Sequence, residues 1–265
     1  MLLNTIKQIS KESLVYGLGY ALHYLIVFMT LPILTRLFSP ADFGLIELVN
    51  ITMIICVQFM ACGMQTALTF YAYDDKAFSS PADVFTHVIA WNAFWGIVVG
   101  VIFGVAFYYL GQSALAMNVP FIAVVYVGMA SYFQTLIDRV KDYFRTIHRP
   151  FMYIFIQVFW AFARLAAILA LWFLSVDILD KYFQFLIVSV VVTCLVSFFV
   201  VRKNFLAPDN LKEKWGRLLK FGAPLVPAGL ATYVMQTCDR WMIAGQLDGE
   251  ALGIYAIGAK ISLLM

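Results

Sequence analysis

The sequence contains few charged residues and few of the side chains that build metal or redox sites. Charged residues make up 12% of the 265 positions, against about a quarter in soluble globular domains. The four cysteines lie in apolar stretches without a CxxC pair, and the three histidines lack metal-ligand spacing. The formal net charge of +3 is spread along the chain and forms no basic patch. We therefore predict no cofactor, no metal and no nucleic-acid partner.

Motifs for catalysis and nucleotide hydrolysis are also missing. Gly253, Gly258 and Lys260 resemble a phosphate-binding loop, but Ala259 separates the glycine from the lysine and the segment is apolar. No Walker motif and no catalytic constellation occur, so the sequence does not predict an enzyme. No small-residue cleavage site closes the first apolar stretch, which favours a transmembrane helix over a removed signal peptide.

Long apolar runs make up most of the chain. Hydrophobic residues account for 63% of it and the mean hydropathy is +0.87, values typical of membrane proteins. Because about 20 apolar residues span a bilayer as a helix, eight spans are predicted. They cover residues 13–35, 43–71, 84–110, 115–137, 150–174, 182–201, 221–244 and 253 onward. The last run reaches Met265 early, so we expect an all-α polytopic membrane protein of about seven to eight transmembrane helices, truncated from a longer one.

The basic residues are distributed unevenly between the loops, and this predicts an orientation. Thirteen cations lie at the N-terminus and in the loops after the second, fourth and sixth spans, but only three in the opposite loops. Cytoplasmic loops are enriched in Lys and Arg, so the N-terminus is predicted to be cytoplasmic. The longest connection, residues 202–220, is basic and is predicted to link a six-helix N-terminal lobe (residues 1–201) to the start of a C-terminal lobe (residues 221–265).

The two ends of the chain share an order of features at an offset of 209 residues. Identical pairs in this register are Lys11 with Lys220, Tyr24 with Tyr233, and Gly44 with Gly253. In both copies an apolar span is followed by a short acidic turn, a glycine and a second apolar span. A spacing of this size favours duplication of a whole helix bundle. Arg36 and Arg240 lie near the two turns and are predicted to face the outer rim.

Polar residues recur on one face of the second span, at separations of three, four or eight positions. They are Glu47, Asn50, Gln58, Cys62, Gln65 and Thr69. Weaker stripes contain His23, Gln157, Gln236 and Asp239 in the first, fifth and seventh spans. A single amide within lipid bonds one helix to another for roughly 0.6–2 kcal/mol. Six such positions on one face favour a water-filled cavity with a polar lining.

Two cations fall inside the predicted spans. Arg164 lies near the middle of the fifth span, where insertion costs about 2.5–3.5 kcal/mol, and Lys260 lies in the eighth. One interpretation is a structural ion pair, for instance between Arg164 and Glu47. The other is that Arg164 and Lys260 face a cavity that receives an anionic substrate.

Two stretches resemble a known family: LPILTRLFSPADFG (31–44) and APLVPAGLATYVMQTCDRWMIAGQLDGEALGIYAIGAK (223–260). They are similar to the polysaccharide-transporter branch of the multidrug/oligosaccharidyl-lipid/polysaccharide exporter superfamily, which includes O-antigen and lipid-linked oligosaccharide flippases. The resemblance implies two six-helix lobes around a central cavity that faces each membrane side in turn. It also implies that helices one, two, seven and eight line much of that cavity.

The function implied is a flippase of the bacterial inner membrane. Its substrate would be a polyprenyl-diphosphate-linked oligosaccharide, such as a repeat unit of O-antigen in lipopolysaccharide, of capsule or of exopolysaccharide. Membrane lipid and other polysaccharide-assembly proteins would be its partners. A cation-coupled multidrug exporter of the same superfamily and an inactive fragment of such a transporter remain as alternatives.

Overall fold

The computed structural model describes residues 2–73, 78–113, 119–173 and 178–262, and this part of the chain contains helices but no strands. Seven helical segments are long and apolar enough to cross a membrane. The prediction of an all-α polytopic membrane protein is therefore confirmed. Lys76, residues 115–118 and the side chains of Lys7 and Lys11 lie outside the described residues.

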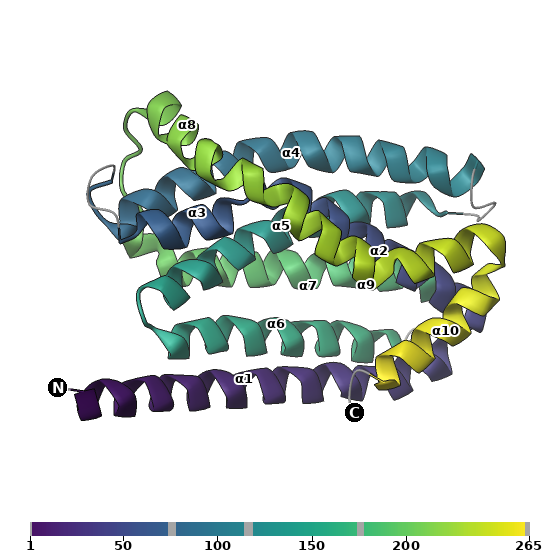
Figure 1. Ribbon diagram of the computed structural model, residues 1–265. Helices are drawn as coiled ribbons and strands as arrows, with labels where there is room; N and C mark the ends of the chain where they lie inside the picture. The colour runs from purple at the N-terminus through teal and green to yellow at the C-terminus, as the bar shows by residue number, and fades with distance from the viewer. Residues whose placement is uncertain (1, 74–77, 114–118, 174–177, 263–265) are drawn as a thin grey trace.

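Seven helices form the first part of the structure. They are α1 (Leu2–Leu37), α2 (Pro40–Ala61), α3 (Met64–Tyr71), α4 (Pro81–Ser113), α5 (Phe121–Thr146), α6 (Pro150–Leu171) and α7 (Ile178–Val201). In Figure 1, α1, α4, α5, α6 and α7 run side by side along the length of the bundle. α5 packs against α4 and α7, and α6 packs against both α1 and α7. Phe85, Phe183 and Tyr182 are among the fully buried side chains of this core.

Three more helices follow the connection after α7. The chain passes through the 3-10 helix η1 (Arg202–Asn204) to α8 (Leu211–Gly222), η2 (Ala223–Leu225), α9 (Val226–Gln246) and α10 (Gly249–Ser262). Figure 1 shows α8 and α9 crossing the bundle obliquely as one rod, after which α10 turns back toward the end of α1. The stretch 202–220, expected as a linker, is therefore helical from Leu211 onward.

The offset of 209 residues seen in the sequence reappears in the helix boundaries. α1 ends at Leu37 and α2 begins at Pro40, and 209 positions later α9 ends at Gln246 and α10 begins at Gly249. The residue before each second helix caps it. The Ser39 hydroxyl accepts from the backbone N–H of Asp42 at 3.2 Å, and the Asp248 carboxylate accepts from that of Ala251 at 2.8 Å. The duplicated α1–α2 and α9–α10 hairpins thus start and stop by the same local chemistry.

The sequence predicts one continuous helix over residues 43–71, and this prediction is wrong. Cys62 and Gly63 adopt left-handed backbone conformations, with φ of 47° and 71°, and divide it into α2 and α3. The reason is a long-range contact, because a Cβ at Gly63 would lie 2.0 Å from the carbonyl oxygen of Gly222. Only glycine permits this approach together with a positive φ. Gln65 and Thr69 therefore belong to a separate helix from Glu47.

The fourth predicted span is also longer than expected at its C-terminal end. α5 continues to Thr146, so Arg139 and Lys141 are helical and buried instead of lying in a loop. Arg139 pairs with Asp142 at 3.2 Å, and Lys141 pairs with Asp138 at 2.7 Å. Three-residue spacing on a helix brings each of these pairs together. The charge count behind the predicted orientation therefore includes two cations that are buried and paired.

Candidate functional site

The two duplicated hairpins meet where α2 crosses α10, and glycine backbones form the contact. A Cβ at Gly44 would lie 1.9 Å from the carbonyl oxygen of Gly249, and a Cβ at Gly253 would lie 1.9 Å from that of Pro40. The 209-residue offset relates Gly44 to Gly253 and Pro40 to Gly249, so the two contacts are equivalent. Only the absence of side chains at these two positions allows the helices to approach so closely.

One turn beyond Gly44, Glu47 forms the centre of an ion cluster. Its side chain is 6% exposed. Oε1 lies 3.2 Å from Nε of Arg240 on α9, and Oε2 lies 2.8 Å from Nζ of Lys260 on α10. The Lys260 ammonium also lies 4.7 Å from the centre of the Phe43 ring. One carboxylate of α2 thus binds two cations from the second hairpin, a group that we name the Glu47 cluster.

Arg164 on α6 lies within electrostatic reach of the Glu47 cluster. Its guanidinium interacts with the hydroxyl groups of Tyr182 and Tyr126 and, at longer range, with the Glu47 carboxylate. Among the described residues no carboxylate oxygen lies within ion-pair distance of it, whereas Arg240 and Lys260 each pair with one oxygen of Glu47. Three cations therefore lie around the Glu47 carboxylate, and the Asp239 carboxylate, which accepts from the backbone N–H of Arg240 at 2.9 Å, lies nearby.

Gln58 of α2 also faces the second hairpin. Asn50 and Gln58 are half-buried, and a Cβ at Gly229 of α9 would lie 2.1 Å from Nε2 of Gln58. On α9, Gln236 is exposed, and Asp239 accepts a hydrogen bond from the Tyr255 hydroxyl of α10. The stripe read from the sequence therefore follows the interface between the hairpins.

His23 and Gln157 belong to a second group, between α1, α5 and α6. The His23 ring is stacked on Trp160 with centroids 5.6 Å apart, and the amide oxygen of Gln157 accepts from Nζ of Lys141 at 2.9 Å. Lys141 also lies 5.9 Å from the centre of the Trp160 ring. The polar stripes predict that His23 and Gln157 line one cavity with Glu47, whereas in the structure both have Lys141 as a neighbour.

The remaining predicted residues have different surroundings. Arg36 is exposed in the last turn of α1, and Gln65 is exposed on α3. Arg240, which was expected to accompany Arg36 at the rim, is directed toward Glu47 instead. No sequence pattern indicated the Arg240–Glu47 pair, because its partners are 193 positions apart and the crossing of α2 with the second hairpin brings them together.

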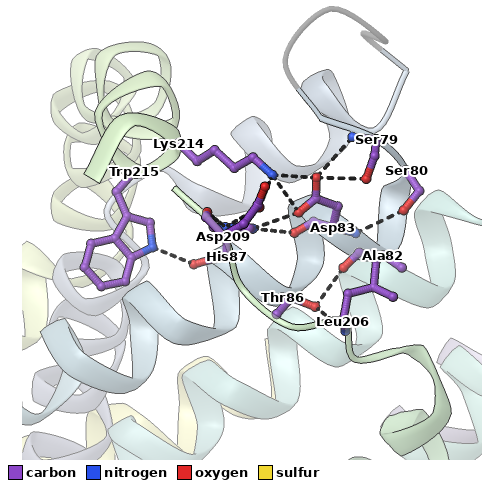
Figure 2. A network of polar contacts seen from close by, with 10 residues as sticks. All are labelled: Ser79, Ser80, Ala82, Asp83, Thr86, His87, Leu206, Asp209, Lys214 and Trp215. Carbon is purple, nitrogen blue, oxygen red and sulfur yellow. Dashed lines mark hydrogen bonds and ion pairs between the residues drawn. The ribbon is translucent and has the colours of Figure 1, made fainter. Parts of the chain in front are cut away.

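A third polar group holds the connection between α7 and α8 against α4. No sequence pattern indicated this group. Figure 2 shows Lys214 of α8 directed at the Asp83 and Asp209 carboxylates. His87 lies 2.7 Å from the backbone oxygen of Asp209, and the Trp215 indole donates to the backbone oxygen of His87 at 3.0 Å. α8 is therefore bound to α4 through side chains from both helices and from the loop that leads into α8.

This third group contains residue types that can bind a metal ion. Ligand atoms of Asp83, His87 and Asp209 lie within 4.8 Å of one another. The Lys214 ammonium, however, lies 2.8 Å from one Asp83 oxygen and already compensates both carboxylates. The donors therefore fit an internal ion pair better than a cation from solution.

Replacing Lys214 with methionine is expected to release the loop before α8. The buried Asp83 carboxylate would lose its cation, and a hydrogen bond to a charged group contributes about 1.5–3 kcal/mol. The Leu206 N–H, which donates to the Thr86 hydroxyl at 3.1 Å, should then exchange with deuterium roughly tenfold faster or more. Lys212→Met, an exposed change on the same helix, is the control, and equal exchange in both variants would contradict this role.

Solved structures with a similar fold are membrane transporters. A proline-to-alanine mutant of a MATE transporter matches with a TM-score of 0.70 and 15% identity, over 97% of this chain and 61% of that chain. A MOP superfamily transporter from Pyrococcus furiosus, described as having a binding pocket of reversed polarity, matches with a TM-score of 0.67 and 15% identity, over 97% and 60%. This chain therefore shares the multi-pass helical fold of these proteins over the part that it covers.

The family follows from the sequence match. A family model described as "Polysaccharide biosynthesis protein" matches residues 9–265, and the chain belongs to this family. An uncharacterized membrane protein of Haemophilus influenzae is 23% identical in an alignment that covers 96% of this chain and 61% of that protein. The chain thus spans about three-fifths of the length of these relatives.

Proposed function

We propose that this protein is a flippase that moves a polyprenyl-diphosphate-linked oligosaccharide from the inner to the outer leaflet by alternating access. The observation that carries the proposal is the excess of cations around Glu47. Arg240 and Lys260 share its one carboxylate, and Arg164 lies within electrostatic reach. Three cations around this carboxylate leave an excess of positive charge even with Asp239 beside Arg240. Such an excess is costly in a membrane-spanning bundle unless an anion binds there.

A diphosphate fits this excess in charge and in geometry. It carries roughly two negative charges, and guanidinium groups such as those of Arg164 and Arg240 bind phosphate oxygens bidentately. Half-buried and exposed amides on α2 and α9, including Asn50, Gln58 and Gln236, would hydrogen-bond the glycan. A cation-exporting multidrug transporter would instead require an excess of acids, so the charges around Glu47 favour the flippase.

The energetics and the cellular setting are compatible with this proposal. Moving one charge through 100 mV is worth about 2.3 kcal/mol, so an inside-negative potential favours outward movement of an anion with two charges. Hydrolysis of a nucleotide is then not required. We place the protein in the bacterial inner membrane with a cytoplasmic N-terminus, beside other polysaccharide-assembly proteins.

Replacing Arg164 with alanine is expected to abolish surface polysaccharide in cells that depend on this gene. The reason is that Arg164, unlike Arg240 and Lys260, has no direct carboxylate partner among the described residues and is the cation most available to a phosphate. Surface glycan is measured by gel or by lectin labelling, at matched protein levels. Arg36→Ala, an exposed arginine of α1, is the control. Normal surface glycan in the Arg164 variant would refute the assignment.

A further inference from the structure

One face of α8 is basic and exposed. Lys212, Gly216 and Lys220 follow one another at intervals of four residues, so they lie on the same side of the helix, and all three are exposed. Arg217 is exposed as well, but it pairs with Glu213 at 2.8 Å. Within the described part of the chain, neither Lys212 nor Lys220 has an ion-pair partner. This face, which we name the lysine face, therefore carries two uncompensated positive charges.

The opposite face of α8 is attached to the bundle. Lys214 pairs with the Asp83 carboxylate of α4 at 2.8 Å, and the Trp215 indole donates to the backbone oxygen of His87 at 3.0 Å (Figure 2). Leu218 is fully buried. The helix cannot turn about its axis without breaking these contacts, so the lysine face stays directed away from the protein.

The length of the rod formed by α8 and α9 places the lysine face at the level of the lipid headgroups. Leu211–Gln246 comprises 36 residues and extends about 54 Å at a rise of about 1.5 Å per residue. The hydrocarbon core of a bilayer is only about 30 Å thick, and α9, with its 21 residues, already covers it. α8 therefore extends into the headgroup layer, at the end of the bundle where α1 begins (Figure 1).

We propose that the lysine face binds the headgroups of anionic phospholipids in the surrounding membrane. The ammonium groups of Lys212 and Lys220 donate to phosphodiester oxygens, which are the anions concentrated in this layer. A zwitterionic headgroup brings a cation of its own, which the two lysines repel, so a headgroup with a net negative charge is preferred. This binding is independent of the Glu47 cluster and of what the protein transports.

The test measures which lipids surround α8 when the protein is in nanodiscs. A fluorophore is attached to Gly216→Cys, because a Cβ at Gly216 has no neighbour within 4 Å and the label then lies between the two lysines. Cys238 and Cys62 are first replaced with serine. The nanodiscs consist of phosphatidylcholine with a small fraction of phosphatidylglycerol or phosphatidylcholine that carries a nitroxide quencher at the same acyl position. Phosphatidylglycerol should quench about fivefold more strongly, the effect of roughly one lysine at an anionic surface.

Two changes should remove this preference. The double variant Lys212→Gln, Lys220→Gln should be quenched equally by the two probes. The double variant Arg36→Gln, Lys181→Gln, which removes two exposed cations from other helices, is the matched control and should behave as the parent. Salt at about 1 M should act like the lysine changes, because it screens exposed charges beyond about 3 Å.

A second label position provides a control in which no charge is changed. Gly245, near the other end of α9, also has no neighbour within 4 Å of a Cβ, and residues 241–259 contain Asp248 and Glu250 but no cation. A fluorophore at Gly245→Cys should be quenched equally by the two probes. Equal quenching at Gly216, the same preference at both positions, or a preference that survives the lysine changes or the salt would overturn the proposal. An equal loss in the two double variants would also overturn it.

Discussion

Replacing Gly44 with valine is expected to separate α2 from α10 and expose the interface between the hairpins. The side chain would need the space that the Gly249 carbonyl occupies, since even a Cβ would lie 1.9 Å from its oxygen. Backbone atoms cannot move aside as a flexible side chain does, and overpacking costs about 1–3 kcal/mol. This corresponds to roughly 10- to 100-fold more of the separated form.

The separation is measured by the labelling of a cysteine at position 252. Leu252 is fully buried on α10, so Leu252→Cys should react slowly with a maleimide in the parent protein. The exposed Cys238 and the partly buried Cys62 are first replaced with serine. We expect labelling at least roughly tenfold faster in the Gly44 variant.

Two further glycine variants make the test specific. Gly253→Val should reproduce the effect, because its Cβ would meet the Pro40 carbonyl in the equivalent contact. Gly258→Val on the same helix should not, since a Cβ there has no neighbour within 4 Å. Similar labelling rates in the Gly44 and Gly258 variants would show that the crossing does not depend on the glycine contact.

Replacing Glu47 with glutamine is expected to destabilise the protein by about 3–5 kcal/mol, the cost of breaking a buried ion pair. The isosteric amide keeps the packing but leaves Arg240 and Lys260 without their common anion. The thermal unfolding midpoint in detergent measures the loss. Glu213→Gln is the control, because its pair with Arg217 is exposed and such pairs contribute at most about 1 kcal/mol.

A charge-balanced variant separates electrostatics from packing. Adding Lys260→Gln and Arg240→Gln to the Glu47 variant removes the uncompensated cations, and neutral replacement of buried ion groups is often tolerated. The triple variant should therefore recover much of the lost stability, although under the proposed function it should not transport. If it were less stable than Glu47→Gln alone, repulsion between cations would not be the cause.

Local sequence patterns located most of the helices, because each span is long, apolar and bounded by turn residues. Ser39 and Pro40 mark the start of α2, for example, and Pro150 marks the start of α6. The break at Cys62–Gly63 was missed because its cause, the backbone of Gly222, is 159 positions away. The continuation of α5 to Thr146 was missed because charged residues such as Arg139 were assigned to a loop, although each has a partner on the same helix.

The sequence indicates which polar residues belong to the site, but not which of them contact one another. The spacing of Glu47, Asn50 and Gln58 predicts that they share one helical face, and the apolar sequence around Arg164 and Lys260 marks these two cations as unusual. Which cation meets which carboxylate is a different question, because a charge in a helix has no preferred partner until the helices cross. Arg240, which the sequence predicts to lie at the outer rim, is therefore found paired with Glu47.

Local sequence patterns alone predict an all-α membrane protein that contains two related hairpins 209 residues apart. Those features follow from hydrophobic length and local capping, which depend on neighbouring residues alone. The tertiary structure decided that the hairpins cross through Gly44 and Gly253, and that Glu47 is shared by Arg240 and Lys260. These contacts require close approach of distant segments, and packing of the whole bundle sets that approach.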